Sequence, residues 1–344
     1  MRSRQTSLAV YTFAHFCVDF ACFFLLYRGF VASVSLEGAW AGLLLYNCVA
    51  FGLQAPIGYF CDMHHGFPAG VLGCMLTALG LCFIDIPWAG LVLSALGNAF
   101  FHVGGGIDSL THANGKLARS GIFVSSGAMG VVLGTLAGKA ELPFFVPFAL
   151  LVISTAGILF FALKSAKDAL RFSGKPAVGG VGIGLMACCL AVCIRAYGGT
   201  ILQLPWRAEL LILPALGAML GKACGGVLAD AFGARRTGVV SLLLCIPLLV
   251  FCYESPLWCT LGIVLFNINM PITLCAVSDR LPGYPGLSFG LTTVALLLGS
   301  IVSFFFAAEQ AQALLLLPVL CVLSAIGIAL AVGGKQKRRN PFLK

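Results

Sequence analysis

Charged residues are scarce in this chain. Of its 344 residues only 12 are Asp or Glu and 21 are Lys or Arg, so 10% are charged while 60% are hydrophobic. A soluble domain carries about 25% charged residues, and this composition excludes an ordinary soluble protein. The sequence also lacks a Gly-x-x-x-x-Gly-Lys-Ser/Thr loop and a helix-opening dinucleotide fingerprint. We therefore expect no cofactor and no direct use of ATP.

Regular cysteine spacing is missing as well. The 15 cysteines are scattered through apolar runs, where they are typical of small packing residues. We expect neither disulfides nor a metal site. The basic "KQKRR" near the C-terminus indicates a membrane-topology anchor, and we expect no nucleic-acid partner.

Long apolar runs fill most of the chain, and each is long enough to cross about 30 Å of hydrocarbon as a helix. The first run contains Asp19 and has no short apolar core before a cleavage site, so we expect a retained span and not a signal peptide. The spans leave no room for a soluble enzyme domain. We predict an all-α multi-pass membrane protein, not an enzyme, with about twelve transmembrane helices near residues 7–33, 38–61, 67–85, 88–107, 119–138, 142–164, 178–203, 208–230, 236–253, 256–277, 285–307 and 311–333.

Basic residues predict the orientation. An even number of spans puts both termini on one side, and Lys and Arg gather there, whereas the other side has little beyond Arg28, Lys139 and Arg207. Because cytoplasmic loops carry the excess of Lys and Arg, we predict cytoplasmic N- and C-termini in the cytoplasmic (plasma) membrane. We expect a monomer.

An internal repeat divides the chain. "QAPIGYFCD" and "KACGGVLAD" both end in Gly-x-x-x-Asp, as Gly58 with Asp62 and Gly226 with Asp230, 168 residues apart. This predicts two six-helix halves of the same orientation, residues 1–164 and 178–344, joined by a cytoplasmic linker at 165–177.

The second copy, "GGVLADAFGARR", resembles the signature loop of the major facilitator superfamily of transporters. The resemblance implies the major facilitator fold of two pseudo-symmetric halves, in which the glycine allows close helix approach and the aspartate caps a neighbouring helix or pairs with basic residues. The gating residues it implies are Gly58, Asp62, Gly226, Asp230, Arg235 and Arg236. The first copy has His64 and His65 where arginines are usual, which indicates a weaker or pH-dependent lock, or else a solvated loop.

The N-terminal half resembles the fosmidomycin-resistance branch of drug exporters, through "HFCVD", "LQAPIGYFCD", "FFH" and "SSGAMGVVLG". It departs from that branch after His102, where "VGGG" replaces a proline and an acid. The resemblance implies export of a small molecule.

Two titratable residues lie inside the first span. Asp19 is about twelve residues, roughly 18 Å, into the helix, where a charge costs about 2.5–3.5 kcal/mol on insertion scales. His15 lies one turn earlier on the same face. We predict that Asp19 and His15 form a proton-coupling site; the alternative is a structural hydrogen bond between helices. Arg28 falls on the opposite face, where we expect it to reach the outer surface.

Other polar residues fall on the fourth, seventh and tenth spans, which line the central cavity in the superfamily, and two more fall at matching positions of the second and eighth spans. The candidate substrate-binding residues are Asn98, His102, Arg195, Tyr197, Asn267, Gln54 and Lys222. If Arg195 and Lys222 face the cavity, the site is positive and favours an anion. The alternatives are packing for His102, interhelical bonds for the asparagines, and a membrane-embedded acid as partner of Lys222.

The sequence thus predicts a secondary transporter that works by alternating access and is coupled to protons, with drug or metabolite antiport favoured. Its expected partners are a small-molecule substrate, protons and the lipid bilayer. Uptake or exchange of a small organic anion is the alternative. A membrane-embedded metal-dependent enzyme is a distant one, for which "DMHH" is the sole candidate cluster.

Overall fold

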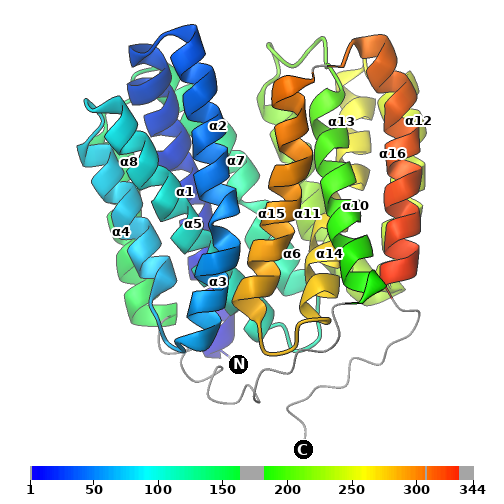
Figure 1. Ribbon diagram of the computed structural model, residues 1–344, viewed down its shortest axis with the longest axis horizontal. Helices are drawn as coiled ribbons and strands as arrows, with labels where there is room; N and C mark the ends of the chain where they lie inside the picture. Colours follow the sequence, from blue (N-terminus) through cyan, green and yellow to red (C-terminus); the bar gives the residue numbers. More distant parts are fainter. Residues whose placement is uncertain (1, 163–181, 307, 333–344) are drawn as a thin grey trace, which may run out of the picture. The chain divides into compact units, whose positions relative to one another are not determined.

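The computed structural model describes residues 2–162, 182–306 and 308–332, and over these residues the chain is helical without β-strands. The predicted linker at 165–177 and the basic tail lie outside them. Figure 1 labels the α-helices. In chain order the elements are α1 (Arg2–Leu25), η1 (Leu26–Phe30), η2 (Val31–Ser33), α2 (Leu36–Gly52), α3 (Gln54–Met63), α4 (Ala69–Cys82), α5 (Pro87–Thr111), α6 (Ala118–Ser125), α7 (Gly127–Lys139), α8 (Phe145–Gly157), η3 (Ile158–Ala162), α10 (Ile183–Ile201), α11 (Ile212–Phe232), α12 (Ala234–Phe251), α13 (Pro256–Asn267), α14 (Asn269–Ser278), α15 (Pro285–Phe305) and α16 (Gln310–Ala331).

These helices confirm the predicted fold class. Eleven spans of the described chain are long and apolar enough to cross a membrane, and α4 is a shorter apolar helix. Some of these spans consist of two successive helices: α2 and α3 form one span, and α13 and α14 form another. Each of the twelve corresponds to one expected segment.

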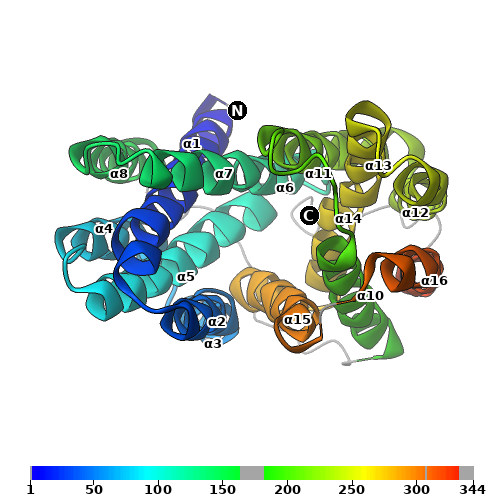
Figure 2. The same cartoon turned by 90° about the horizontal axis from the view of Figure 1, so that it is seen from above.

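The chain separates into two compact units. Unit 1 comprises Met1–His112, Ser126–Gly174 and Tyr284–Gly290. Within it α4 packs along α5 and α1 along α7, and α1 also contacts α4, α5 and α8, so α1 is surrounded by neighbouring helices (Figure 2). Close packing of α1 and α7 depends on glycine, because a Cβ at Gly130 would lie 2.5 Å from the Phe16 carbonyl oxygen.

Unit 2 comprises Ala113–Ser125, Lys175–Gly283 and Leu291–Lys344. Within it α10 packs along α16, α11 contacts α6 and α13, and α12 contacts α13 and α16. The boundary between the units falls inside α15 and between α6 and α7. The first turn of α15 therefore belongs to unit 1, and α6 belongs to unit 2.

Local sequence explains where several helices begin and end. Ser35 caps α2 by accepting a hydrogen bond from the Gly38 N–H at 3.1 Å, as expected of an N-cap serine. Proline is the first residue of α5 and of α13, where its missing N–H costs nothing. Gly233, at φ 90°, ends α11 in the left-handed region that favours glycine.

Candidate functional site

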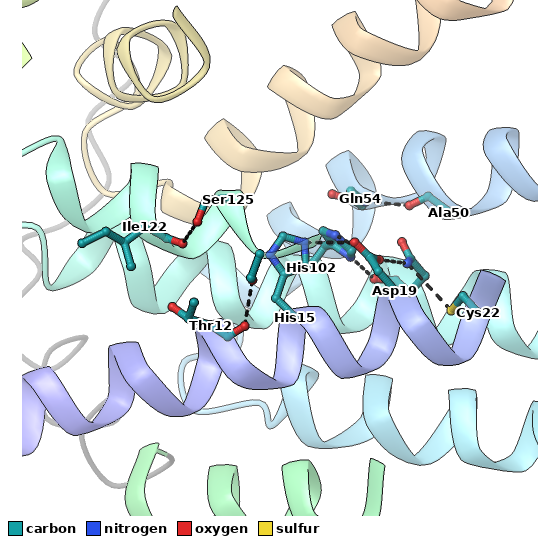
Figure 3. Close-up of polar contacts among 11 residues, drawn as sticks. Thr12, His15, Asp19, Cys22, Ala50, Gln54, His102, Ile122 and Ser125 are labelled. Carbon is teal, nitrogen blue, oxygen red and sulfur yellow. Dashed lines mark hydrogen bonds and ion pairs between the residues drawn. The ribbon is translucent and has the colours of Figure 1, made fainter. Parts of the chain in front are cut away.

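A cluster of polar side chains lies inside unit 1 around the Asp19 carboxylate. Asn98 of α5 donates through Nδ2 to Asp19 Oδ1 at 2.9 Å. His15 Nε2 lies 3.3 Å from Oδ2 and His102 Nε2 lies 3.8 Å from Oδ1. All four residues are buried. Figure 3 shows His15 and Asp19 from α1 pointing toward His102, so the two residues predicted from the first span meet two predicted from the fourth.

The protonation of His102 follows from its partners. Its Nδ1 lies 2.9 Å from the Asn98 carbonyl oxygen, which can only accept, so Nδ1 carries a hydrogen. Nε2 then carries a hydrogen only when the imidazole is protonated. A neutral His102 would turn a lone pair toward the Asp19 carboxylate. A proton on either His102 or Asp19 would relieve this repulsion.

Other groups interact with Asp19 without supplying a charge near neutral pH. Cys22 on α1 and Tyr46 on α2 are the further titratable residues that interact with it electrostatically, and both ordinarily ionise only in alkaline solution. From α7 the neighbour is backbone, because a Cβ at Gly127 would collide with Asp19 Oδ2 and His15 Nε2. The Asn98 Oδ1 atom is buried and has no hydrogen-bond partner among the described residues.

The same cluster has the donor set of a metal site. One ligand atom each from His15, Asp19 and His102 lies within 4.8 Å of the others, and two imidazoles with a carboxylate are a common transition-metal set. The sequence predicted no metal ligand, so this grouping is a feature that only the structure reveals. A proton and a divalent cation would bind the same nitrogen and oxygen atoms of these three residues. A chelator would remove the cation and leave the proton, so it distinguishes the two cases in a transport assay.

A cavity of about 320 Å³ lies inside unit 2. Three of the predicted substrate-binding residues, Arg195, Lys222 and Asn267, line it together with Arg207 and Met270. Asn267 donates through Nδ2 to the Ile263 carbonyl oxygen at 2.9 Å. The positive residues anticipated from the sequence thus share one cavity, which contains no Asp or Glu in its lining.

Tyr197 and Gln54 lie elsewhere. Tyr197 is half-buried on α10 and is not part of the cavity lining. Gln54 is fully buried at the start of α3, where its amide donates to the Ala50 carbonyl oxygen at 2.7 Å (Figure 3). Its Oε1 atom has no hydrogen-bond partner among the described residues. Arg28, in η1, lies 3.8 Å from Glu141, and both side chains are substantially exposed.

The two repeated aspartates each cap a helix. In unit 1 Asp62 accepts from the backbone N–H groups of Gly286 at 2.9 Å and Leu287 at 2.8 Å, in the first turn of α15. In unit 2 Asp230 accepts from Leu117 at 2.8 Å and Ala118 at 3.0 Å, at the start of α6. A carboxylate at a helix N-terminus satisfies unpaired N–H groups and interacts favourably with the helix dipole.

The repeated glycines allow these contacts. A Cβ at Gly58 would collide with the Gly286 carbonyl group, and one at Gly226 would lie 2.6 Å from the Leu117 carbonyl oxygen. Of the two roles that the resemblance implied for the aspartates, capping is the one observed. Arg235 and Arg236 are exposed, and no ion pair joins either to Asp230 in the described chain.

The first-copy histidines are exposed. His64 stacks on the Phe60 ring at 4.2 Å between centroids, and its Nδ1 lies 3.0 Å from the Phe60 carbonyl oxygen. His65 is exposed beside it. Asp62 accepts its two hydrogen bonds from α15 without them.

Sequence reasoning missed a second buried histidine–acid pair in unit 1. His112 Nδ1 lies 3.1 Å from Asp108 Oδ1, and the Ser7 hydroxyl donates to the same carboxylate at 2.9 Å. All three are buried. The four-residue spacing of Asp108 and His112, the same as that of Asn98 and His102, could have indicated this pair. Both residues lie just beyond the predicted span at 88–107, so they were not considered as membrane residues.

Comparisons with known proteins bear on the fold. No family model and no curated protein sequence matches the chain. Solved structures do. The E. coli fucose:proton symporter FucP matches with a TM-score of 0.68 at 13% identity, over 95% of this chain and 98% of that one. The human organic anion transporter MFSD10 matches with a TM-score of 0.68 at 16% identity, over 95% and 99%.

A third likeness is to a bacterial homologue of the iron transporter ferroportin in its outward-facing state, with a TM-score of 0.62 at 15% identity over 96% of this chain and 98% of that one. All three are transporters by name, and FucP has been described as a major facilitator superfamily transporter. At these identities the likeness concerns architecture. The chain has the fold of the major facilitator transporters.

Proposed function

We propose that the protein is a secondary transporter that moves a small molecule across the cytoplasmic membrane by alternating access and couples this movement to protons. The fold supports the transporter class, and the fucose:proton symporter among its structural neighbours is an example of proton coupling. The distribution of Lys and Arg in the sequence supports an orientation with both termini in the cytoplasm, and we take the monomer as the working unit.

One observation carries the proposal of proton coupling: the buried Asp19 carboxylate faces His15 and His102, and a neutral His102 would turn a lone pair toward it. Ionisable residues at membrane depth commonly mark proton pathways. Each transport cycle would load and release one proton at Asp19, His15 and His102, with Asn98 orienting the carboxylate through its 2.9 Å hydrogen bond.

The caps made by Asp62 and Asp230 support a gating role. Each aspartate lies at the end of a predicted span, and the contacts join residues 224 and 113 positions apart in the chain. Breaking and remaking each contact is a small local event in alternating access, because each involves only two hydrogen bonds to backbone N–H groups. We assign Gly58 and Gly226 to the same gate, because they make the close approach possible.

Two directions of transport are candidates. The resemblance of the N-terminal half to the fosmidomycin-resistance branch favours drug or metabolite export by antiport. Uptake or exchange of an organic anion is the second candidate, supported by Arg195 in the unit 2 cavity and by the likeness to an organic anion transporter.

Two measurements test the proposal. Infrared difference spectra of the purified protein between acid and alkaline pH should contain a protonated-carboxyl band that Asp19→Asn removes. In proteoliposomes with a trapped pH indicator, a solute panel that includes fosmidomycin should reveal coupled proton movement that Asp19→Asn abolishes. Asp85→Asn is the matched control, because Asp85 is an exposed acid.

Two outcomes would contradict the proposal. Undiminished proton movement in Asp19→Asn would remove Asp19 from the coupling step. A requirement for metal, seen as loss of transport on adding a chelator and recovery on adding zinc, would show that the cluster works as a metal centre.

A further inference from the structure

The cavity of unit 2 contains a buried arginine whose hydrogen-bonding capacity is largely unused. Arg195 is 6% exposed and lies on α10. Its Nη2 donates to the Met270 sulfur at 3.3 Å, which is a weak acceptor. Its Nε–H is buried and has no hydrogen-bond partner among the described residues. Because Nε and Nη2 share one edge of the planar guanidinium, that whole edge lacks an oxygen acceptor.

No carboxylate of the described residues forms an ion pair with this guanidinium. The lining of the cavity includes Arg195, Lys222 and Arg207 but no Asp or Glu. A guanidinium placed in a low-dielectric region without an anion is costly. Structural arginines avoid that cost by pairing, so an unpaired one suggests that its partner is a ligand.

The rest of the lining describes the kind of anion that fits. Asn267, Thr200 and Ser300 supply an amide and two hydroxyls, and most of the remaining residues are apolar, such as Leu249, Phe266 and Leu317. A cavity of about 320 Å³ falls at the small end of small-molecule sites. It suits a compact molecule with an anionic group at one end and an apolar body.

We infer that this cavity is a binding site for a small organic anion, with the Nε–Nη2 edge of Arg195 holding the anionic group in a bidentate pair. Two parallel N–H···O bonds are the arrangement in which arginine recognises carboxylates and related anions most strongly. The inference rests on the proposed transport function and names its substrate class. Lys222 adds positive potential from α11, and Asn267 offers a further polar contact.

Binding to the purified full-length protein tests the inference. The probes are benzoate, benzenesulfonate and succinate, each compared with its neutral amide: benzamide, benzenesulfonamide and succinamide. Affinity is measured by calorimetry in detergent at fixed pH, without any gradient. We expect at least one anion to bind at least tenfold more tightly than its amide, and Arg195→Gln to abolish that preference. A tenfold change corresponds to about 1.4 kcal/mol.

Matched variants separate charge from folding. Arg28→Gln removes one positive charge from an exposed site in unit 1 and should leave anion binding unchanged. Ser300→Asp places a competing carboxylate in the cavity and should abolish anion binding, whereas Ser300→Asn, with a neutral side chain of the same size as Asp, should bind the anion at least tenfold more tightly than Ser300→Asp does. This pair keeps the inference testable even if Arg195→Gln fails to fold.

The inference is overturned if no anion binds better than its amide, or if Ser300→Asp and Ser300→Asn behave alike. Because binding in detergent requires no proton gradient, this result is independent of Asp19. Anion binding with no proton coupling would refute the coupling mechanism alone, and proton coupling with no anion preference would refute the anion site alone.

Discussion

The capping contact of Asp62 gives the most quantitative prediction. Asp62→Asn keeps one carbonyl oxygen and the shape of the side chain but removes the charge and one acceptor for the Gly286 and Leu287 N–H groups. Hydrogen bonds to a charged group contribute about 1.5–3 kcal/mol and neutral ones about 0.5–1.5 kcal/mol. Because two bonds of the first kind are replaced by one of the second, we expect a loss of at least about 1.5 kcal/mol.

Such a loss corresponds to an increase of at least about tenfold in the population of the uncapped state. Hydrogen–deuterium exchange measures this population directly, because the Gly286 and Leu287 N–H groups that donate to Asp62 are themselves exchangeable. The segment covering residues 284–290 should exchange at least about ten times faster in Asp62→Asn. The segment covering residues 117–121, at the start of α6, should not change.

Asp230→Asn supplies the reciprocal measurement. It should accelerate hydrogen–deuterium exchange at residues 117–121 and leave the exchange rate of residues 284–290 unchanged. The effect should be smaller, because Asp230 is exposed whereas Asp62 is 1% exposed, and water can replace lost hydrogen bonds at an exposed site. Equal changes at both segments in either variant would refute the reasoning, since they would indicate general destabilisation and not loss of one cap.

Three further predictions follow from contacts in unit 1. Gly127→Ala places a methyl group against Asp19 and should lower the free energy of unfolding by about 1–3 kcal/mol. Gly199→Ala in unit 2 is the control for this variant: its new Cβ would have its nearest neighbour at 3.5 Å, so the free energy of unfolding should not change. Thermal unfolding measures both variants. His102→Gln should shift the pH dependence of transport measured in proteoliposomes, and an unchanged profile would remove His102 from the proton site. Ser7→Ala deletes the 2.9 Å hydrogen bond to buried Asp108 and should cost about 1.5–3 kcal/mol in unfolding free energy, so an unaltered melting temperature would contradict that contact's importance.

Much of the fold could be read from the sequence because membrane spans are encoded locally. Each expected span matches one helix or two or three successive helices. The Gly-x-x-x-Asp repeat also placed Asp62 and Asp230 near the C-terminal ends of their helices, α3 and α11. The four-residue spacing of His15 and Asp19 was enough to put them on one face, since α-helical geometry depends only on separation along the chain.

The candidate site was harder to predict because its contacts join distant residues. Arg195 and Lys222 were candidates for a positive site, but nothing in the sequence said whether an acid would pair with Arg195. The buried pair of Asp108 and His112 was overlooked because its third member, Ser7, lies 101 residues away.

By itself, then, the sequence determined the helical class, the number of spans and the residues repeated in the two halves, because hydropathy and periodicity act within a single helix. Only the tertiary structure decided that Asp62 caps α15, that His102 lies beside the Asp19 carboxylate, and that the Arg195 guanidinium lines a cavity whose described lining contains no acid. Those outcomes depend on which donors and acceptors meet across helices far apart in the chain, and a one-dimensional pattern does not encode that geometry.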